Sequence, residues 1–112
     1  MLSTGGCPKN IRAIKDAIDV VDRKWRLLIL ITLSEGSKRF TQIAKDVTGI
    51  SDKMLSKELQ ALELNKLIKK EVTHAFPETV EYCITPHGKS LEKVMTELYQ
   101  WGLEHRKQII GK

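Results

Sequence analysis

The feature that most constrains this chain is a repeated cap-and-helix pattern between residues 41 and 64. Thr41 is placed to cap a short helix over residues 42–47. The next residues, Thr48-Gly49-Ile50, form a turn in which Gly49 can adopt the positive φ that a tight corner between helices often needs. Ser51 is then placed to cap a longer helix over residues 52–64. This order predicts a helix–turn–helix motif.

Two further helices are expected before this motif. With Asn10 as its cap, a helix over residues 11–21 carries apolar side chains at the 3.6-residue period. Residues 25–33 are apolar nearly all round, which is typical of a central buried helix, and Gly36 is placed to end it.

After the motif the pattern changes to that of a hairpin. Residues 67–72 and 80–84 resemble two short strands, and the loop between them contains Pro77. Thr85 can cap a last helix that has Pro86 at its first position and runs to about residue 107. A hairpin directly after a helix–turn–helix forms a winged helix. The alternative is a helical bundle with an incidental hairpin.

We therefore expect one α+β, mostly α, domain over residues 1–112. It is a winged helix–turn–helix with the motif at about 41–64, the wing at about 67–84 and a C-terminal dimerisation helix at about 86–107. The length fits one domain, and there is no internal repeat or linker.

Composition excludes several other classes of protein. With 41% hydrophobic and 29% charged residues, the chain is too apolar and too mixed in charge to be a disordered tail. Its longest apolar run, residues 27–31, is too short to cross a bilayer, so no membrane partner is expected. The first nine residues lack the apolar segment of a secretory signal, which predicts a cytoplasmic location.

The formal net charge of +5 suggests a polyanionic partner, although a solvated basic surface would look the same. The excess is largest around the motif, because residues 36–71 hold eight basic and five acidic residues. Residues 72–83, which form most of the expected wing, hold two acidic residues and no basic ones. The basic character therefore belongs to the helix–turn–helix more than to the wing.

The second helix of the motif has a clear inner and outer face. At 100° per residue, Leu55, Leu59 and Leu62 fall within about 60° of one another and must face the core. The outer face carries hydrogen-bonding side chains and only one nearby acid, Glu58. The candidates for DNA contact on and before this helix are Ser51, Lys53, Met54, Ser56, Lys57 and Gln60.

These residue types suit a helix inserted in the major groove. Lysine can donate to guanine acceptors, glutamine can pair with adenine, and the start of the helix can meet a phosphate. The alternative is an ordinary solvated helix face. Further candidates, which would position the protein rather than read bases, are Lys38, Arg39 and Thr41 before the motif and Lys66, Lys69, Lys70 and His74 around the wing.

The last helix carries a wide apolar stripe at positions i, i+3, i+4, i+7, i+10 and i+11. A small domain that already buries residues 25–33 has little core left for this stripe to cover, so it indicates a homodimer. The alternative is packing within its own domain. The expected interface residues are Ile11, Ile14 and Ile18 on the first helix and Leu91, Val94, Met95, Leu98, Trp101 and Gly102 on the last.

Neither metal nor enzymatic chemistry has a recognisable pattern in this sequence. There is no CxxC pair, the three histidines are scattered, and no phosphate loop or nucleophile elbow is present. We expect no metal, no cofactor and no catalytic residue. Cys7 lies among glycines and beside a cation, so it is a candidate for a reactive thiol, whereas Cys83 on the second strand suits an inert structural thiol.

Seven short motifs along nearly the whole chain also resemble those of a known family. They are Cys7-Pro8, Asp22-x-Lys24-Trp25, Lys38-Arg39-Phe40, Ile50-Ser51-Asp52-Lys53-Met54-Leu55, Leu59-x-x-Leu62-Glu63, Val80-Glu81-Tyr82 and Ile84-Thr85-Pro86-x-Gly88. In this order and spacing they resemble the HxlR-type transcriptional regulators of bacteria and archaea, which are related to the MarR-like winged-helix proteins.

The resemblance implies a homodimer that binds an inverted-repeat operator in double-stranded DNA through its winged helix. It implies a dimer interface made by the first and last helices, and an oxidant- or electrophile-sensing cysteine at Cys7. The chain departs from the family at two places: Lys57-Glu58 stands in a recognition helix that is commonly richer in arginine, and Thr79 stands where a wing arginine is common. The competing function is a winged helix that binds only protein. The sequence identifies no small-molecule effector.

Overall fold

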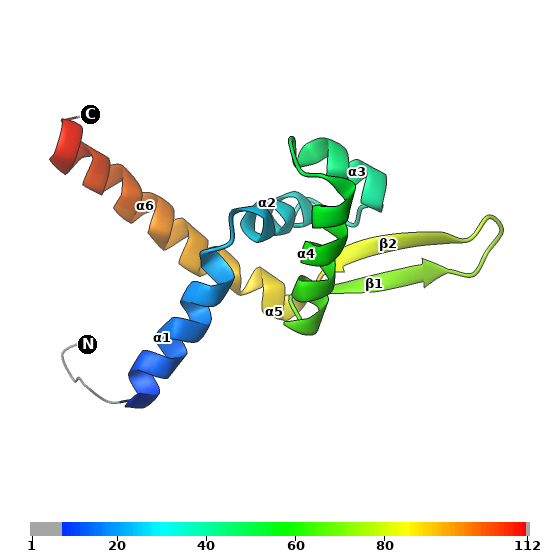
Figure 1. Ribbon diagram of the computed structural model, residues 1–112, viewed down its shortest axis with the longest axis horizontal. Helices are drawn as coiled ribbons and strands as arrows, with labels where there is room; N and C mark the ends of the chain where they lie inside the picture. Colours follow the sequence, from blue (N-terminus) through cyan, green and yellow to red (C-terminus); the bar gives the residue numbers. More distant parts are fainter. Residues whose placement is uncertain (1–7, 112) are drawn as a thin grey trace.

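The structure is a computed structural model that describes residues 8–111 of the chain. Its elements follow one another as four helices, a hairpin and two C-terminal helices (Figure 1). They are α1 (Pro8–Val21), α2 (Lys24–Leu33), α3 (Phe40–Asp46), α4 (Asp52–Leu64), β1 (Ile68–Thr73), β2 (Thr79–Ile84), α5 (Pro86–Lys89) and α6 (Leu91–Ile110).

The helix–turn–helix forms with the local devices that the sequence predicts. Gly49 has a φ of 95°, and the Ser51 hydroxyl accepts a hydrogen bond from the Met54 backbone N–H at 3.1 Å. Helix α4 has the expected bounds. The cap of α3 was assigned wrongly, because Arg39 precedes the helix and its backbone N–H donates to Gln42 Oε1 at 2.9 Å. Thr41 instead lies in the first turn of α3.

The first and last helices also differ from expectation. Helix α1 begins at Pro8, so Asn10 lies inside it and is not its cap; proline is tolerated in the first turn of a helix. The last helix is interrupted at Ser90, whose hydroxyl donates to the His87 carbonyl at 2.5 Å. After this interruption α6 continues to Ile110 and ends at Gly111, which has a φ of 75°.

The core lies where α2, α3, α4 and the base of the hairpin meet. Leu55, Leu59 and Leu62 are fully buried there, as predicted from the helical period. Helix α2 was expected to be buried all round, and this is wrong: Leu28 is 38% exposed and Ile31 is 51% exposed. One side of α2 faces the core, and the other side is left uncovered by the rest of the chain.

The hairpin pairs antiparallel, with Val72 opposite Val80 and Lys70 opposite Tyr82. Lys38 adds a bridge beside it, because the backbones of Lys38 and Tyr82 exchange hydrogen bonds of 3.1 and 2.8 Å. The segment between α2 and α3 is therefore tied to the base of the wing.

Helix α5 approaches the hairpin closely at Gly88. A Cβ atom at this position would lie 2.2 Å from the Leu67 carbonyl oxygen and 2.7 Å from Ile84 Cγ1. Thr85 caps α5 by accepting from the Gly88 N–H at 3.0 Å, and Pro86 stands in its first turn as predicted. The glycine thus sets the point from which α6 leaves the body of the molecule.

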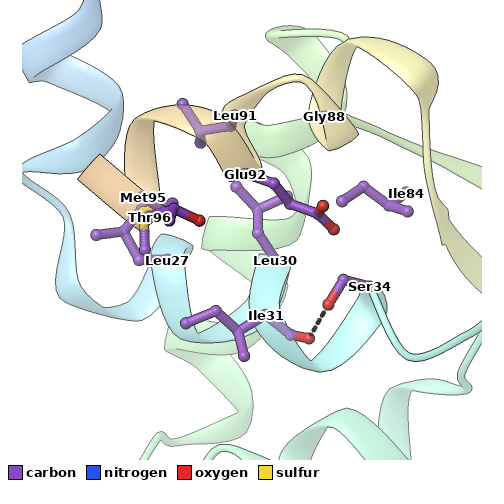
Figure 2. Close-up of a pocket in the computed structure, with 10 residues that line it drawn as sticks. All are labelled: Leu27, Leu30, Ile31, Ser34, Ile84, Gly88, Leu91, Glu92, Met95 and Thr96. Atoms are coloured by element: carbon purple, nitrogen blue, oxygen red, sulfur yellow. Dashed lines mark hydrogen bonds between the residues drawn. The ribbon is translucent and has the colours of Figure 1, made fainter. Parts of the chain in front are cut away.

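Helices α1 and α6 extend from one side of the body as two arms (Figure 1). The radius of gyration is 16.9 Å, against about 13 Å for a compact domain of this length. At the base of α6 a cavity of about 180 Å³ is lined by Leu91 and Met95 of α6 and by Leu27 and Ile31 of α2 (Figure 2). The junction between arm and body is therefore only partly filled by the chain's own side chains.

Candidate nucleic-acid interface

The outer face of α4 has the composition and exposure expected of a DNA-reading helix. Its candidate side chains all lie on the exposed side of the helix, opposite the buried leucines. Neither lysine on this face makes an ion pair with any residue that the structure describes. The exposed candidates on α4 are Lys53, Met54, Ser56, Lys57 and Gln60.

Glu58, the acid expected beside this face, turns inward instead. It is 6% exposed, and its carboxylate accepts a hydrogen bond from Nε of Arg26 at 3.1 Å. The pair joins α2 to α4 and removes the nearest negative charge from the outer face. The helical period alone did not predict this, because the partner lies 32 residues earlier in the chain.

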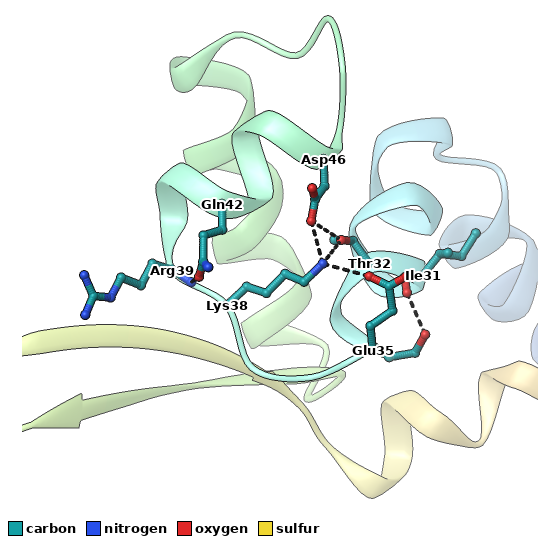
Figure 3. A network of polar contacts seen from close by, with 8 residues as sticks. Ile31, Thr32, Glu35, Lys38, Arg39, Gln42 and Asp46 are labelled. Atoms are coloured by element: carbon teal, nitrogen blue, oxygen red, sulfur yellow. Dashed lines mark hydrogen bonds and ion pairs between the residues drawn. The ribbon is translucent and has the colours of Figure 1, made fainter.

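Lys38, expected to contact phosphate, has its ammonium group inside a polar network (Figure 3). It donates to Thr32 Oγ1 at 2.6 Å, to Glu35 Oε1 at 2.8 Å and to Asp46 Oδ2, and Thr32 itself donates to Asp46 at 2.8 Å. A lysine has three N–H donors, so all three are already used. The contacts give Lys38 an internal role that ties α2 to α3.

This network also changes the acidity of its members. Hydrogen bonds to Asp46 and Glu35 raise the pKa of Lys38 above its ordinary value of 10.5. Hydrogen bonds from Lys38 and Thr32 lower the pKa of Asp46 below its ordinary value of 3.8. The ion pair therefore keeps both charges at neutral pH.

Arg39 and Thr41 remain accessible at the start of α3. The guanidinium of Arg39 points away from the Lys38 network (Figure 3) and has no ion pair within residues 8–111. Thr41 is exposed in the first turn of the helix. Both lie at the end of α3 where backbone N–H groups are free of helical partners.

The wing carries few free cations. Lys69 Nζ lies 3.9 Å from Glu71, and His74 Nδ1 lies 3.8 Å from Glu78 near the tip. Lys70 Nζ lies 5.9 Å from the centre of the Tyr82 ring. The structure therefore spreads the wing candidates along a hairpin that extends away from α4 (Figure 1), while the α4 candidates share one helix face.

Sequence reasoning overlooked two cations beside this face. Arg23 and Lys24 precede and begin α2, and they line a hollow together with Met54 and Lys57 of α4. Their position in the sequence, well before the motif, gave no sign that the fold would bring them to the recognition helix.

The residues predicted for a dimer interface lie mainly on the exposed sides of the arms. The structure buries no residue of α6 and none of residues 10–21. Trp101 is 65% exposed, and a Cβ atom at Gly102 would have no neighbour within 4 Å. Leu91, Met95 and Gly102 are partly buried, whereas Ile11, Ile14, Ile18, Val94 and Leu98 are exposed.

Of the two cysteines, Cys83 is the one that the structure describes. Cys7 lies outside the described residues. Cys83 is buried, donates to Glu71 Oε1 at 2.8 Å, and lies 2.9 Å from the Ser37 hydroxyl. Burial, followed by the hydrogen bond to Glu71, raises the pKa of the Cys83 thiol above its ordinary value of 9.0. This agrees with the prediction of an inert structural thiol, since the thiolate is the reactive form.

Within residues 8–111 no cluster of three or more histidine, cysteine or acidic side chains could hold a metal ion. In the same part of the chain, none of the helices has the length and apolar character needed to cross a membrane.

Comparison with known proteins decides the family. A family model described as HxlR-like helix-turn-helix matches residues 20–110. The chain belongs to this family.

Individual relatives of this HxlR-type chain are also helix-turn-helix transcriptional regulators. A helix-turn-helix transcriptional regulator of Methanothermobacter thermautotrophicus is 37% identical over 90 residues, which are 80% of this chain and 69% of that protein. The regulator YodB of Bacillus subtilis is 34% identical over 95 residues, covering 85% of this chain and 81% of YodB.

Solved structures show the same architecture. The reduced form of YodB superposes with a TM-score of 0.79 at 31% identity, covering 95% of this chain and 96% of that one. The redox regulator HypR in its oxidized form gives a TM-score of 0.73 at 29% identity, covering 82% and 95%. The predicted winged helix–turn–helix fold is confirmed, and the protein is a transcriptional regulator rather than an enzyme.

Proposed function

We propose that this HxlR-type regulator binds double-stranded DNA sequence-specifically as a homodimer, at an inverted-repeat operator. The observation that carries the proposal is the outer face of α4, where Lys53, Lys57 and Gln60 are exposed while Glu58 is turned into the core against Arg26. A helix of this kind fits the major groove.

Each side chain has a distinct role in this proposal. Lys53 and Lys57 donate to guanine acceptors, and Gln60 pairs with adenine. Ser56 and Met54 border this face, and Ser51 holds the start of the helix toward a phosphate. The residues that contact the backbone around the motif are Arg39, Thr41, Lys66, Lys69, Lys70 and His74.

The exposed arms support the homodimer. Helix α6 has 20 residues, none of them buried, yet it carries apolar residues along one stripe. An exposed stripe of this size on a single chain marks an interaction surface. Pairing α1 and α6 of two copies about a two-fold axis would place two α4 helices roughly 34–36 Å apart, one turn of DNA.

The proposal is tested by the salt dependence of DNA binding. A protein that neutralises several phosphates loses affinity steeply as salt rises, so a mobility shift with a random duplex should weaken strongly between two salt concentrations. Once an operator has been selected from genomic fragments, Lys53→Ala and Lys57→Ala should each weaken binding to it by roughly 1–3 kcal/mol. Lys93→Ala, a change on α6 outside the apolar stripe, is the matched control.

The rival function is a winged helix that binds only protein. It predicts no binding to duplex DNA, or binding that salt does not change. If both α4 variants bind the operator as well as the wild type does, the assignment of α4 as the reading helix is wrong.

We also propose that Cys7 makes DNA binding responsive to oxidants or electrophiles. Two structural neighbours bear on this: HypR is described as a redox regulator, and YodB has been solved both reduced and after treatment with diamide. Cys83 is poorly suited to this role because it is buried and its pKa is raised. If Cys7→Ser protein still loses or gains DNA affinity with diamide as the wild type does, Cys7 is not the sensor.

A further inference from the structure

A hollow of about 320 Å³ lies between the start of α2 and the first two turns of α4. Arg23 and Lys24 line it from the α2 side, and Met54 and Lys57 line it from the α4 side. The hollow therefore adjoins the half of the recognition helix that reaches deepest into a major groove. We call Arg23, Lys24 and Lys57 the junction patch.

The charges around the hollow leave a net positive surface. Arg26 and Glu58 also line it, but they form an ion pair with each other. Arg23, Lys24 and Lys57 are exposed and make no ion pair with any described residue. Asp22 is the remaining acid beside them.

The start of α2 is fixed against the motif by Trp25. A Cβ atom on Gly49, in the turn between α3 and α4, would lie 3.7 Å from Cη2 of the Trp25 ring. The ammonium of Lys24 lies 4.7 Å from the centre of the same ring. These contacts place the cations at a defined position beside the helix–turn–helix.

The junction patch and the wing differ in charge. Residues 72–83 of the wing carry two acids and no lysine or arginine, so they have no cation other than a protonated His74 for a phosphate. The α2 side of α4 carries Arg23, Lys24 and Lys57, which have no ion pair within residues 8–111. Electrostatic attraction to DNA is therefore stronger on the α2 side than on the distal wing.

We propose that Arg23 and Lys24, which lie beside Lys57, bind phosphates of the DNA strand that borders the major groove occupied by α4. This inference rests on the DNA-binding function proposed above and extends the interface to a segment before the motif. The contact is to backbone phosphate, so it adds affinity and orientation without reading sequence.

The test measures how the dissociation constant of random 30-base-pair duplexes depends on potassium chloride concentration. Arg23→Met and Lys24→Met remove one charge each and keep an apolar stem, and Lys93→Met on α6 is the charge-matched control. Each junction variant should reduce the slope of log affinity against log salt by about 0.9 per lost phosphate contact in each protomer. Affinity should fall by a similar factor on every duplex.

Lys24→Arg keeps the charge and should restore the wild-type slope, which separates loss of a phosphate contact from a disturbed fold. If the wild type binds DNA but both methionine variants behave like Lys93→Met, the junction patch is not part of the interface and the proposed function stands. If the wild type shows no salt-dependent binding to any duplex, the proposed function fails, and this inference fails with it.

Discussion

The helix–turn–helix body, from α2 to α5, buries many of its apolar side chains, whereas the two arms of this regulator leave most of theirs exposed. Every buried residue among those described lies between residues 29 and 88, on α2 to α5. The arms, α1 and α6, carry large apolar residues that are mostly exposed, among them Ile18, Leu98 and Trp101. The body thus contains the hydrophobic core, whereas the arms present apolar surface that one chain leaves largely uncovered.

This difference assigns different roles to the two parts of the fold. The body fixes α4 relative to α3 and the wing through a hydrophobic core, the Arg26–Glu58 pair and the Lys38 network. Helix α6 leaves the body beside the close contact at Gly88, next to a partly empty cavity, and α1 joins α2 through residues 22–23. Substitutions in the body should therefore change folding, and substitutions in the arms should change association.

The largest expected effect is in the body core. Leu59→Ala should lower the free energy of unfolding by about 2–5 kcal/mol, because it leaves a cavity among fully buried side chains. Leu64→Ala, at a residue that is 83% exposed on the same helix, should change it by less than about 0.5 kcal/mol. Denaturant unfolding at one fixed protein concentration measures both. Equal effects would contradict the division between core and surface on α4.

In the arms we expect a change in association and not in folding. Trp101→Ala should weaken dimerisation by about 2 kcal/mol or more, roughly a 30-fold rise in the dissociation constant, because buried tryptophans dominate interfaces. Analytical ultracentrifugation measures this. Phe76→Ala at the wing tip, an aromatic residue that is even more exposed than Trp101, is the control and should leave association unchanged. A Trp101→Ala protein that stays fully dimeric would show that α6 does not form the interface.

Two glycines, one in the body and one in α6, test the same difference between body and arms. Gly88→Ala should destabilise the protein by about 1–3 kcal/mol, since the new methyl would overlap the Leu67 carbonyl oxygen. Gly102→Ala in α6 meets no atom of its own chain and should not lower the stability of the body. Thermal unfolding of the two variants compares them. If Gly88→Ala is as stable as the wild type, the close approach of α5 to the hairpin is not required.

The smallest expected effect is on how the free energy of unfolding depends on pH, through the Lys38 network. The pKa of Asp46 is lowered in the folded protein, so its contribution to stability is complete above the ordinary value of 3.8 and is lost as pH falls through the lowered pKa. Asp46→Asn should remove the loss of stability in acid that comes from protonation of Asp46, and should leave the loss that comes from other carboxylates. Unfolding curves measured between pH 2 and pH 5 should therefore converge for the two proteins at low pH. Curves that stay parallel throughout would contradict a specific role for Asp46.

Much of the body could be predicted because its signals are local. Ser51 and Thr85 cap the helices that follow them, Gly49 takes its positive φ, and the 3.6-residue period identifies the buried leucines of α4. Each of these depends on neighbours within a few residues. The errors of element assignment, at Asn10, Thr41 and Ser90, are also local and concern only where a helix begins or is interrupted.

The candidate site was less predictable, because the state of a charged side chain depends on partners far along the chain. Glu58 was expected beside the reading face, and Arg26 draws it inward. Lys38 was expected to reach phosphate, and Thr32, Glu35 and Asp46 occupy its donors. A helical period gives the direction of a side chain but not its partner.

The sequence by itself therefore determined the order of elements, the helix–turn–helix with its wing, the family, and the apolar stripes on the first and last helices. The tertiary structure decided which cations are free, brought Arg23 and Lys24 beside α4, and left Leu28 and Ile31 uncovered. The physical reason is the distance along the chain over which each interaction acts. Capping, turns and periodicity act within a turn or two of helix. Ion pairing and burial are set by whichever residues folding brings together.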